Sequence, residues 1–237
     1  MTETRREVHA DAAAVAARAA ELLAAELAAS RGPAAVCLSG GSTPRRLYEL
    51  LATQPWRGRI PWERAHWFWG DERCVPPDHP DSNYGMVRRA MLDPVAAPAA
   101  NVHPVRTLDL TPEAAAAAYA AELQRWYGAP ALEAGRPLFT VNLLGLGEDG
   151  HTASLFPGTP ALQERQRWAV AVIGARPEPR VSLTYPALNS ARLTLVLVTG
   201  SGKREVLARL AAGADLPAAH VRPAGPLVWL LDRAAAE

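Results

Sequence analysis

A short turn in the second half of the chain carries an aspartate and a histidine that are separated by one glycine. The turn occupies residues 147–151, reads Gly-Glu-Asp-Gly-His, and follows an apolar run at 138–144. Histidine, with a reference pKa of about 6.5, is the natural general base at neutral pH, and a nearby carboxylate orients its ring and stabilises the imidazolium. The pattern predicts a catalytic pair of His151 and Asp149, with an exposed surface turn as the alternative. Glu148 is expected to be a surface residue.

A second turn, at residues 39–43, suits an anion. It reads Ser-Gly-Gly-Ser-Thr and leads into a helical pattern, whose free backbone amides and dipole favour negative charge. Gly40 and Gly41 let the backbone approach a phosphate closely, and the hydroxyls of Ser42 and Thr43 can donate hydrogen bonds to it. A purely structural turn is the alternative interpretation.

Basic residues follow or open three further predicted elements. Arg73 ends an Asp-Glu-Arg cluster behind an aromatic run at 67–69, Arg180 opens a short strand, and Lys203 begins a helix. The fork of an arginine can clamp a phosphate or a carboxylate, although an ordinary ion pair would also explain Arg73. Lys203 is the one lysine among 25 basic residues. Its retention indicates a site that fits only a point charge, with chance as the alternative explanation.

Other chemistries are not indicated. The turn at 39–43 lacks the spacing of a nucleotide P-loop, the six histidines are scattered without metal-ligand spacing, and no Gly-x-Ser-x-Gly elbow is present. We therefore expect neither a cofactor nor a metal. Tyr185, Asn189 and Ser190 are weaker candidates, expected to shape the wall of the pocket.

The elements that must position these residues alternate between strands and helices. Strands are expected near 34–38, 65–69, 138–144, 168–173, 180–184, 193–198 and 227–231, and helices near 11–30, 44–51, 82–91, 112–127 and 203–212. This order predicts an α/β fold with a mostly parallel sheet. Ligands bind at the carboxyl ends of such strands, where the polar clusters fall, so we expect the clusters to meet around one pocket.

Composition limits the class of protein. The chain has 237 residues, 49% of them hydrophobic, and a formal net charge of +1. That balance excludes a disordered or coiled-coil chain and argues against binding nucleic acid through bulk charge. No apolar stretch reaches the roughly 20 residues that span a bilayer, and no secretion signal is visible. We expect a single domain over residues 1–237, located in the cytoplasm, with no membrane partner and with Cys37 and Cys74 reduced.

Five motifs, in order along the chain, resemble the 6-phosphogluconolactonase family. They are SGGSTP at 39–44, WGDER at 69–73 with SNY at 82–84, GLGEDGHTASLFP at 145–157, RVSLT at 180–184 and GSGK at 200–203. The resemblance covers roughly 32–231. It implies a Rossmann-like sheet flanked by helices, as in the glucosamine-6-phosphate deaminase and ribose-5-phosphate isomerase-like folds. It also implies hydrolysis of 6-phospho-D-glucono-1,5-lactone to 6-phosphogluconate in the oxidative pentose phosphate pathway.

Two other functions are compatible with parts of this pattern. The related deaminases and isomerases share the first turn and the Asp-Gly-His motif, but carry a glutamate five residues after the histidine that assists ring opening. Phe156 occupies that place here, and Arg73 stands where the rival group has a tyrosine. A sugar-phosphate-binding regulator without catalysis would usually carry a DNA-binding module, for which no segment is left over. Both comparisons favour the lactonase.

The resemblance and the chemistry of a lactone together give an expected mechanism. His151 activates a water, and Asp149 holds the imidazole or, alternatively, braces the turn. Backbone amides or a cation stabilise the oxyanion, and the protonated histidine returns its proton to the leaving ring oxygen. The substrate is a small sugar-phosphate lactone. Its phosphate is expected to bind among the candidate residues Gly40, Gly41, Ser42, Thr43, Arg73, Arg180 and Lys203.

Overall fold

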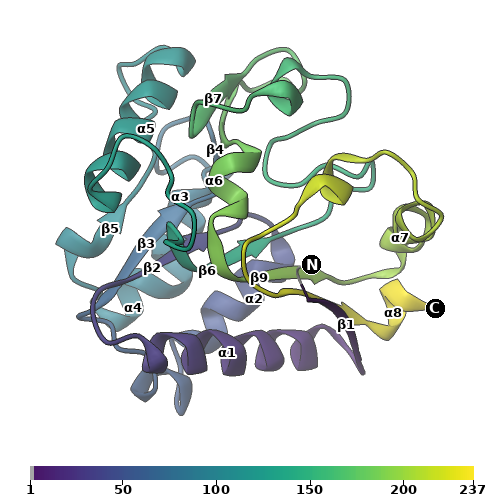
Figure 1. Ribbon diagram of the computed structural model, residues 1–237. Coiled ribbons are helices and arrows are strands. Elements are labelled where there is room, and N and C mark those ends of the chain that lie inside the picture. The colour runs from purple at the N-terminus through teal and green to yellow at the C-terminus, as the bar shows by residue number, and fades with distance from the viewer. Residues whose placement is uncertain (1–2) are drawn as a thin grey trace.

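A sheet of seven parallel strands forms the centre of the molecule (Figure 1). The structure is a computed structural model and describes residues 3–237. The strand order is β1-β10-β9-β6-β2-β3-β5. Since every neighbouring pair is parallel, the carboxyl ends of all these strands lie along one edge. The strands are β1 (Thr4–His9), β2 (Ala34–Leu38), β3 (Ala65–Trp69), β5 (Val102–His103), β6 (Phe139–Leu144), β9 (Ala191–Val198) and β10 (Leu227–Asp232).

A second, antiparallel sheet stands at that edge. It contains β4 (Asp71–Arg73), β8 (Arg180–Leu183) and β7 (Ala169–Val172), in the order β4-β8-β7. Gly70 connects the two sheets: its N–H donates to the carbonyl of Leu38 in β2 at 2.8 Å, and its carbonyl accepts from the N–H of Leu183 in β8 at 2.8 Å. The sequence predicted a polar cluster at 71–73 without assigning it to a strand, and these residues pair with β8 as a strand.

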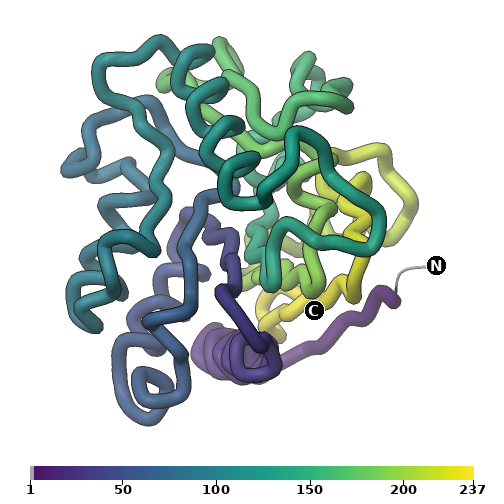
Figure 2. The backbone as a smooth tube through the Cα atoms, turned by 60° about the vertical axis from the view of Figure 1, so that its left-hand side comes forward, coloured from purple at the N-terminus to yellow at the C-terminus, as the bar shows by residue number. Residues whose placement is uncertain are grey.

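Helices cover the sheets. In Figures 1 and 2 α1 lies along the lower side of the molecule, whereas the small sheet and α5 lie at the top. No helix in the described range 3–237 is long and apolar enough to cross a membrane. The α-helices are α1 (Ala12–Ala29), α2 (Ser42–Leu51), α3 (Asn83–Val87), α4 (Asp93–Val95), α5 (Pro112–Tyr127), α6 (Tyr185–Asn189), α7 (Arg204–Ala211) and α8 (Arg233–Ala236).

Short helical turns connect several of these elements. A π-type turn, η2 (Arg88–Leu92), joins α3 to α4, so the helix expected near 82–91 is helical but not uniformly α-helical. The 3₁₀ turns are η1 (Trp56–Gly58), η3 (Ala99–Asn101), η4 (Pro160–Gln163), η5 (Ser201–Lys203) and η6 (Pro217–His220).

Local sequence explains why α5 begins and ends where it does. Thr111 caps its start by accepting a hydrogen bond from the N–H of Ala114 at 3.2 Å, and Pro112 occupies the first helical position, where no N–H is needed. Gly128 ends the helix in the left-handed conformation, with φ of 77°. The predicted boundaries at 112 and 127 are confirmed.

The core lies on both faces of the parallel sheet. All five residues of β2 are buried, as expected for a central strand covered on both sides. Trp67, Phe68 and Trp69 of β3 are fully buried, which confirms that this aromatic run is core. The mostly parallel α/β fold predicted from the sequence is confirmed.

Candidate active site

A pocket of about 220 Å³ opens at the carboxyl edge of the parallel sheet. That volume is below the ~300–1,000 Å³ typical of sites for drug-sized ligands, so the pocket suits a compact molecule. Five segments predicted to carry site residues meet here: the turn after β2, strand β4, the turn after β6, strand β8 and the start of α7. Of the candidates, those that line the pocket are Gly40, Gly41, Arg73, His151, Arg180 and Lys203.

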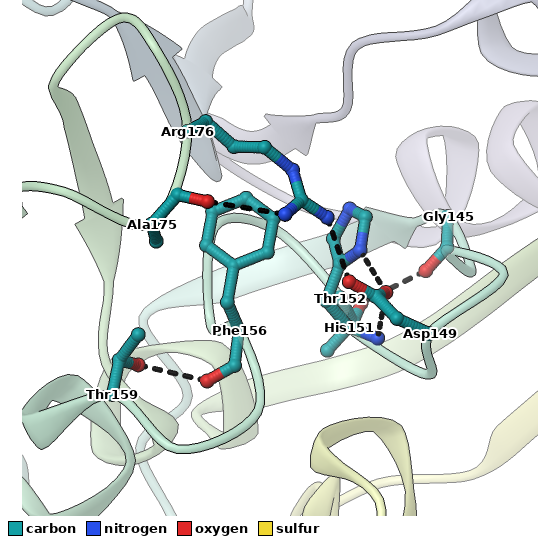
Figure 3. A network of polar contacts seen from close by, with 8 residues as sticks. All are labelled: Gly145, Asp149, His151, Thr152, Phe156, Thr159, Ala175 and Arg176. Carbon is teal, nitrogen blue, oxygen red and sulfur yellow. Dashed lines mark hydrogen bonds and ion pairs between the residues drawn. The ribbon is translucent and has the colours of Figure 1, made fainter.

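His151 and Asp149 form a close contact at the side of this pocket (Figure 3). The Nδ1 atom of His151 lies 2.5 Å from Oδ1 of Asp149, and the backbone N–H of His151 donates to the same oxygen at 3.1 Å. Because Nδ1 is engaged, Nε2 is the ring nitrogen left to act on a ligand. Partial burial opposes ionisation of Asp149, but hydrogen bonds from His151 and from Arg176 outweigh it and lower the pKa of Asp149.

Gly147 is required for this packing. A Cβ atom at residue 147 would lie 2.0 Å from Nδ1 of His151 and 2.8 Å from Oδ1 of Asp149, closer than non-bonded atoms approach. The backbone N–H of Gly147 also donates to the carbonyl of His151 at 2.8 Å, which closes the turn. The glycine therefore lets the imidazole fold back over its own turn.

Phe156 supplies the surface on which the histidine rests. Its ring centroid lies 4.5 Å from that of His151, and the side chain is 3% exposed. The guanidinium carbons of Arg176 and Arg180 lie over the same ring, 4.5 Å and 5.6 Å from its centroid. A buried aromatic residue thus contacts the imidazole and two guanidinium groups at the position where the deaminase pattern has a glutamate.

The turn before α2 presents backbone donors. Gly41 has φ of 102° and stands as the N-cap without a side-chain cap, so the first N–H groups of α2 keep their capacity to bind an anion. Gly40 approaches Asn83 so closely that a Cβ there would lie 2.0 Å from the amide oxygen of Asn83. The pocket lining does not include Ser42 or Thr43. The hydroxyl of Thr43 instead contacts that of Thr199 at 2.6 Å.

Arg73 and Arg180 face the pocket from neighbouring strands of the small sheet. The Nε atoms of both are buried and have no hydrogen-bond partner. Arg73 donates to the carbonyl of Asp81 at 2.7 Å, and no carboxylate in the described range 3–237 forms an ion pair with either arginine. Burial, and then the Arg73 cation, lower the pKa of Arg180. Two cations without an ion-pair partner among the described residues form a site for an anionic ligand.

Lys203 reaches the pocket from the side of the large sheet. It ends η5, and its N–H donates to the carbonyl of Gly200 at 3.1 Å. Asp232, at the end of β10, accepts hydrogen bonds from the N–H of Gly200 at 3.0 and 3.1 Å and so fixes the turn. No described carboxylate lies within ion-pairing distance of the Lys203 ammonium.

Two buried carboxylates of β4 organise the wall between these groups. Asp71, which lines the pocket, accepts from the hydroxyl of Ser154 at 2.6 Å. Glu72 accepts from the backbone N–H groups of Arg73, Asn83 and Tyr84 at 2.7–2.8 Å. Burial raises the pKa of Glu72 to about 7, against these hydrogen bonds. Neither carboxylate was singled out from the sequence.

Three residues expected in the pocket wall have other uses. The hydroxyl of Tyr185 donates to the carbonyl of Pro217 at 2.9 Å, Asn189 accepts from the N–H of Arg222 at 2.8 Å, and Ser190 accepts from the N–H of Leu138 at 2.9 Å. These contacts brace loops around β6 and β9. The expectation for Tyr185, Asn189 and Ser190 was wrong, because α6 follows β8 and carries them away from the lining.

The fold and the site define a class of protein. It is an α/β protein whose parallel sheet ends in a cationic pocket served by a histidine–carboxylate pair, an arrangement suited to small anionic ligands. A family model described as glucosamine-6-phosphate isomerases/6-phosphogluconolactonase matches residues 8–229. The chain belongs to this family.

Comparison with individual proteins shows which members of the family the chain resembles. The chain is 45% identical over 236 residues to a protein of Nostoc sp. named 6-phosphogluconolactonase, covering 97% of this chain and 95% of that one. A solved 6-phosphogluconolactonase from Trypanosoma cruzi superposes with a TM-score of 0.86 at 30% identity, covering 100% of this chain and 97% of that chain. A monomeric glucosamine-6-phosphate deaminase has a TM-score of 0.80 at 19% identity and covers 99% of each chain, so it shares the fold.

Proposed function

We propose that this chain hydrolyses 6-phospho-D-glucono-1,5-lactone to 6-phospho-D-gluconate in the oxidative pentose phosphate pathway, and that it does so in the cytoplasm. One observation carries the proposal: a single pocket holds His151, tied through Nδ1 to Asp149, together with the cations Arg73, Arg180 and Lys203. The name of the Nostoc relative supports this interpretation.

The pair of His151 and Asp149 supplies the base. Nε2 of His151 takes a proton from a water molecule as the water oxygen bonds to the lactone carbonyl carbon. Asp149 accepts from Nδ1 and stabilises the imidazolium that forms. The tetrahedral intermediate then breaks its bond to the ring oxygen, which receives the proton from Nε2. The net change is addition of one water and opening of the ring, with no covalent enzyme intermediate.

The cations and the α2 turn hold the phosphate away from the reacting carbon. Arg73, Arg180 and Lys203 line the pocket and form no ion pair with any described carboxylate, and Gly40 and Gly41 bring the N-terminus of α2 to it. Binding the phosphate fixes the lactone carbonyl beside the base, which raises the rate without further contacts to the ring. Ser42 and Thr43 are left out of this assignment, because neither lines the pocket.

Phe156 weighs against deamination or isomerisation. A phenylalanine ring cannot transfer a proton, and this one is buried in contact with His151 and Arg176. The lactone needs no ring-opening acid at that place, because water attack itself opens the ring.

Hydrolysis of freshly generated lactone, followed as acid release above the spontaneous rate, tests the proposal. We expect wild type to accelerate the reaction and His151→Gln to lose about 10²–10⁴-fold in kcat. Asp149→Asn should also lose activity, up to about 10⁴-fold, because an amide no longer holds the tautomer that leaves Nε2 free to accept a proton.

His220→Gln is the matched control. His220 also pairs with an aspartate, Asp215, but its side chain is exposed and lies at the end of η6, outside the pocket lining. We expect it to retain wild-type kcat. Turnover by His151→Gln at the wild-type rate would refute the role of the base, and tight binding of 6-phosphogluconate without any turnover would favour a regulator.

A further inference from the structure

Arg176, in the loop between β7 and β8, contacts the carboxylate partner of the histidine (Figure 3). Its Nη2 donates to Oδ2 of Asp149 at 2.7 Å, while Oδ1 of the same carboxylate lies against the ring and backbone N–H of His151. Both oxygens of Asp149 are therefore engaged by groups from different segments. A carboxylate bound in this way cannot turn about its Cβ–Cγ bond without losing hydrogen bonds.

Phe156 and the backbone of Ala175 also hold the guanidinium of Arg176. It lies 4.5 Å above the centroid of Phe156, the ring on which His151 packs, and its Nη1 donates to the carbonyl of Ala175 at 3.1 Å. Arg176, Asp149, His151 and Phe156 therefore form a closed circuit of contacts. A buried aromatic face and a charged hydrogen bond hold a side chain that is otherwise 41% exposed.

We propose that Arg176 is a positioning residue for lactone hydrolysis: it fixes the carboxylate of Asp149 and so holds the imidazole of His151 correctly turned. This inference rests on the proposed function. The cation offsets part of the negative charge of Asp149, and that charge would otherwise favour protonation of the ring. A histidine must be neutral to accept a proton from water, so Arg176 extends its working range toward lower pH.

Other charges also face the histidine. Asp149 comes from its own turn, Arg180 from β8 across Phe156, and Arg73, Lys203 and Asp71 from the remaining lining of the pocket. Glu148, next to Asp149, is exposed and lies against Gly202. All of these remain when Arg176 is replaced, so a change in the pH profile of that variant reports Arg176 itself.

Arg176→Met and Arg176→Lys test the proposal. Methionine keeps an apolar contact with Phe156 but removes the charge, whereas lysine keeps the charge near Asp149. We expect Arg176→Met to lower kcat on the order of tenfold with little change in KM, and to move the acidic limb of the kcat/KM profile to higher pH by roughly half a unit. Arg176→Lys should restore the position of that limb.

Arg59→Met is the matched control, because Arg59 also lies over an aromatic ring, 4.6 Å from the centroid of Trp56, but stands outside the pocket lining. It should leave both kcat and the profile unchanged. A profile for Arg176→Met that coincides with wild type, or a lysine variant as displaced as the methionine variant, would overturn the positioning role.

Histidine NMR separates this inference from the proposed function. The imidazole signals of His151, assigned by their loss in His151→Gln, should titrate at higher pH in Arg176→Met than in wild type. If they do so in a wild type that hydrolyses no lactone, the proposed function fails and the coupling between Arg176 and His151 stands. An unchanged titration in an active wild type would reject the coupling.

Discussion

Arg73 lies directly opposite Arg180 in the antiparallel pairing of β4 with β8. Like charges in that position destabilise a strand pair, by roughly 0.2–1 kcal/mol in the general case, and no described carboxylate pairs with either guanidinium. Both Nε atoms are buried without a partner. The small sheet is thus less stable without a ligand than it would be with neutral residues, and a bound anion removes this cost.

Arg180→Met tests this relationship. Without ligand, we expect the variant to melt at or above the wild-type temperature, since one member of the repelling pair is gone. 6-Phosphogluconate should raise the melting temperature of wild type much more than that of the variant, because a charge-assisted hydrogen bond is worth about 1.5–3 kcal/mol. Scanning calorimetry with and without ligand measures both. A variant that melts well below wild type without ligand would show a structural role instead.

Lys203→Met separates phosphate binding from catalysis. We expect KM for the phosphorylated lactone to rise about 10–100-fold while kcat changes little, because the ammonium binds the ground state and the transition state alike. The unphosphorylated lactone should be hydrolysed as fast by the variant as by wild type. Arg209→Met, on α7, which begins directly after Lys203, but outside the pocket lining, is the control. Equal losses on both lactones would remove Lys203 from the phosphate site.

Gly147→Ala should displace the histidine without unfolding the protein. The added Cβ would lie 2.0 Å from Nδ1 of His151, so the ring must leave Asp149. A misplacement of about 1 Å can cost about 10²-fold in rate, and we expect kcat/KM to fall by at least this much. Gly32→Ala is the control, since nothing lies within 4 Å of its added Cβ. Activity of Gly147→Ala near that of wild type would contradict the need for a glycine beneath the imidazole.

The raised pKa of Glu72 predicts that the free energy of unfolding depends on pH. Burial raises its pKa from 4.5 to about 7, so the folded state binds a proton more tightly than the unfolded state. The contribution of this group is therefore fully present below about pH 4.5 and is lost as pH rises through about 7. We expect the free energy of unfolding of wild type, measured by urea denaturation relative to Glu72→Gln, to fall across that window. A difference that is constant between pH 5 and 8 would exclude this titration.

Two strands, β2 and β3, were predicted to the residue. Both lie inside the parallel sheet, and each is followed within two residues by a glycine, so the end of the apolar run and the chain breaker coincide. Strand β1 was missed because it is an edge strand whose residues Thr4, Arg5 and Arg6 are exposed. Its partner is β10, more than two hundred residues away in the sequence, and no local sequence pattern predicts that pairing.

In the candidate site, too, some residues could be predicted from the sequence and others could not. A parallel sheet brings the carboxyl ends of its strands together, and so the turns with Gly40, His151 and Lys203 could be expected around one pocket. The pairing of Arg73 with Arg180 depends on the register of β4 and β8. These strands are far apart in the sequence, so no hairpin turn fixes that register. Arg176 lies in a loop of small, proline and charged residues. Contacts with Asp149 and Phe156, rather than the local sequence, set the orientation of its side chain.

The joint at Gly70 has a consequence for selectivity. The imidazole belongs to a turn of the large sheet, the guanidinium groups belong to the small one, and the backbone of Gly70 is hydrogen-bonded into both. We therefore expect the distance between a carbonyl carbon held at His151 and an anion held at Arg73 and Arg180 to depend on how the two sheets meet. Substitutions beneath that junction, remote from any bound molecule, would alter which chain length of sugar acid is preferred.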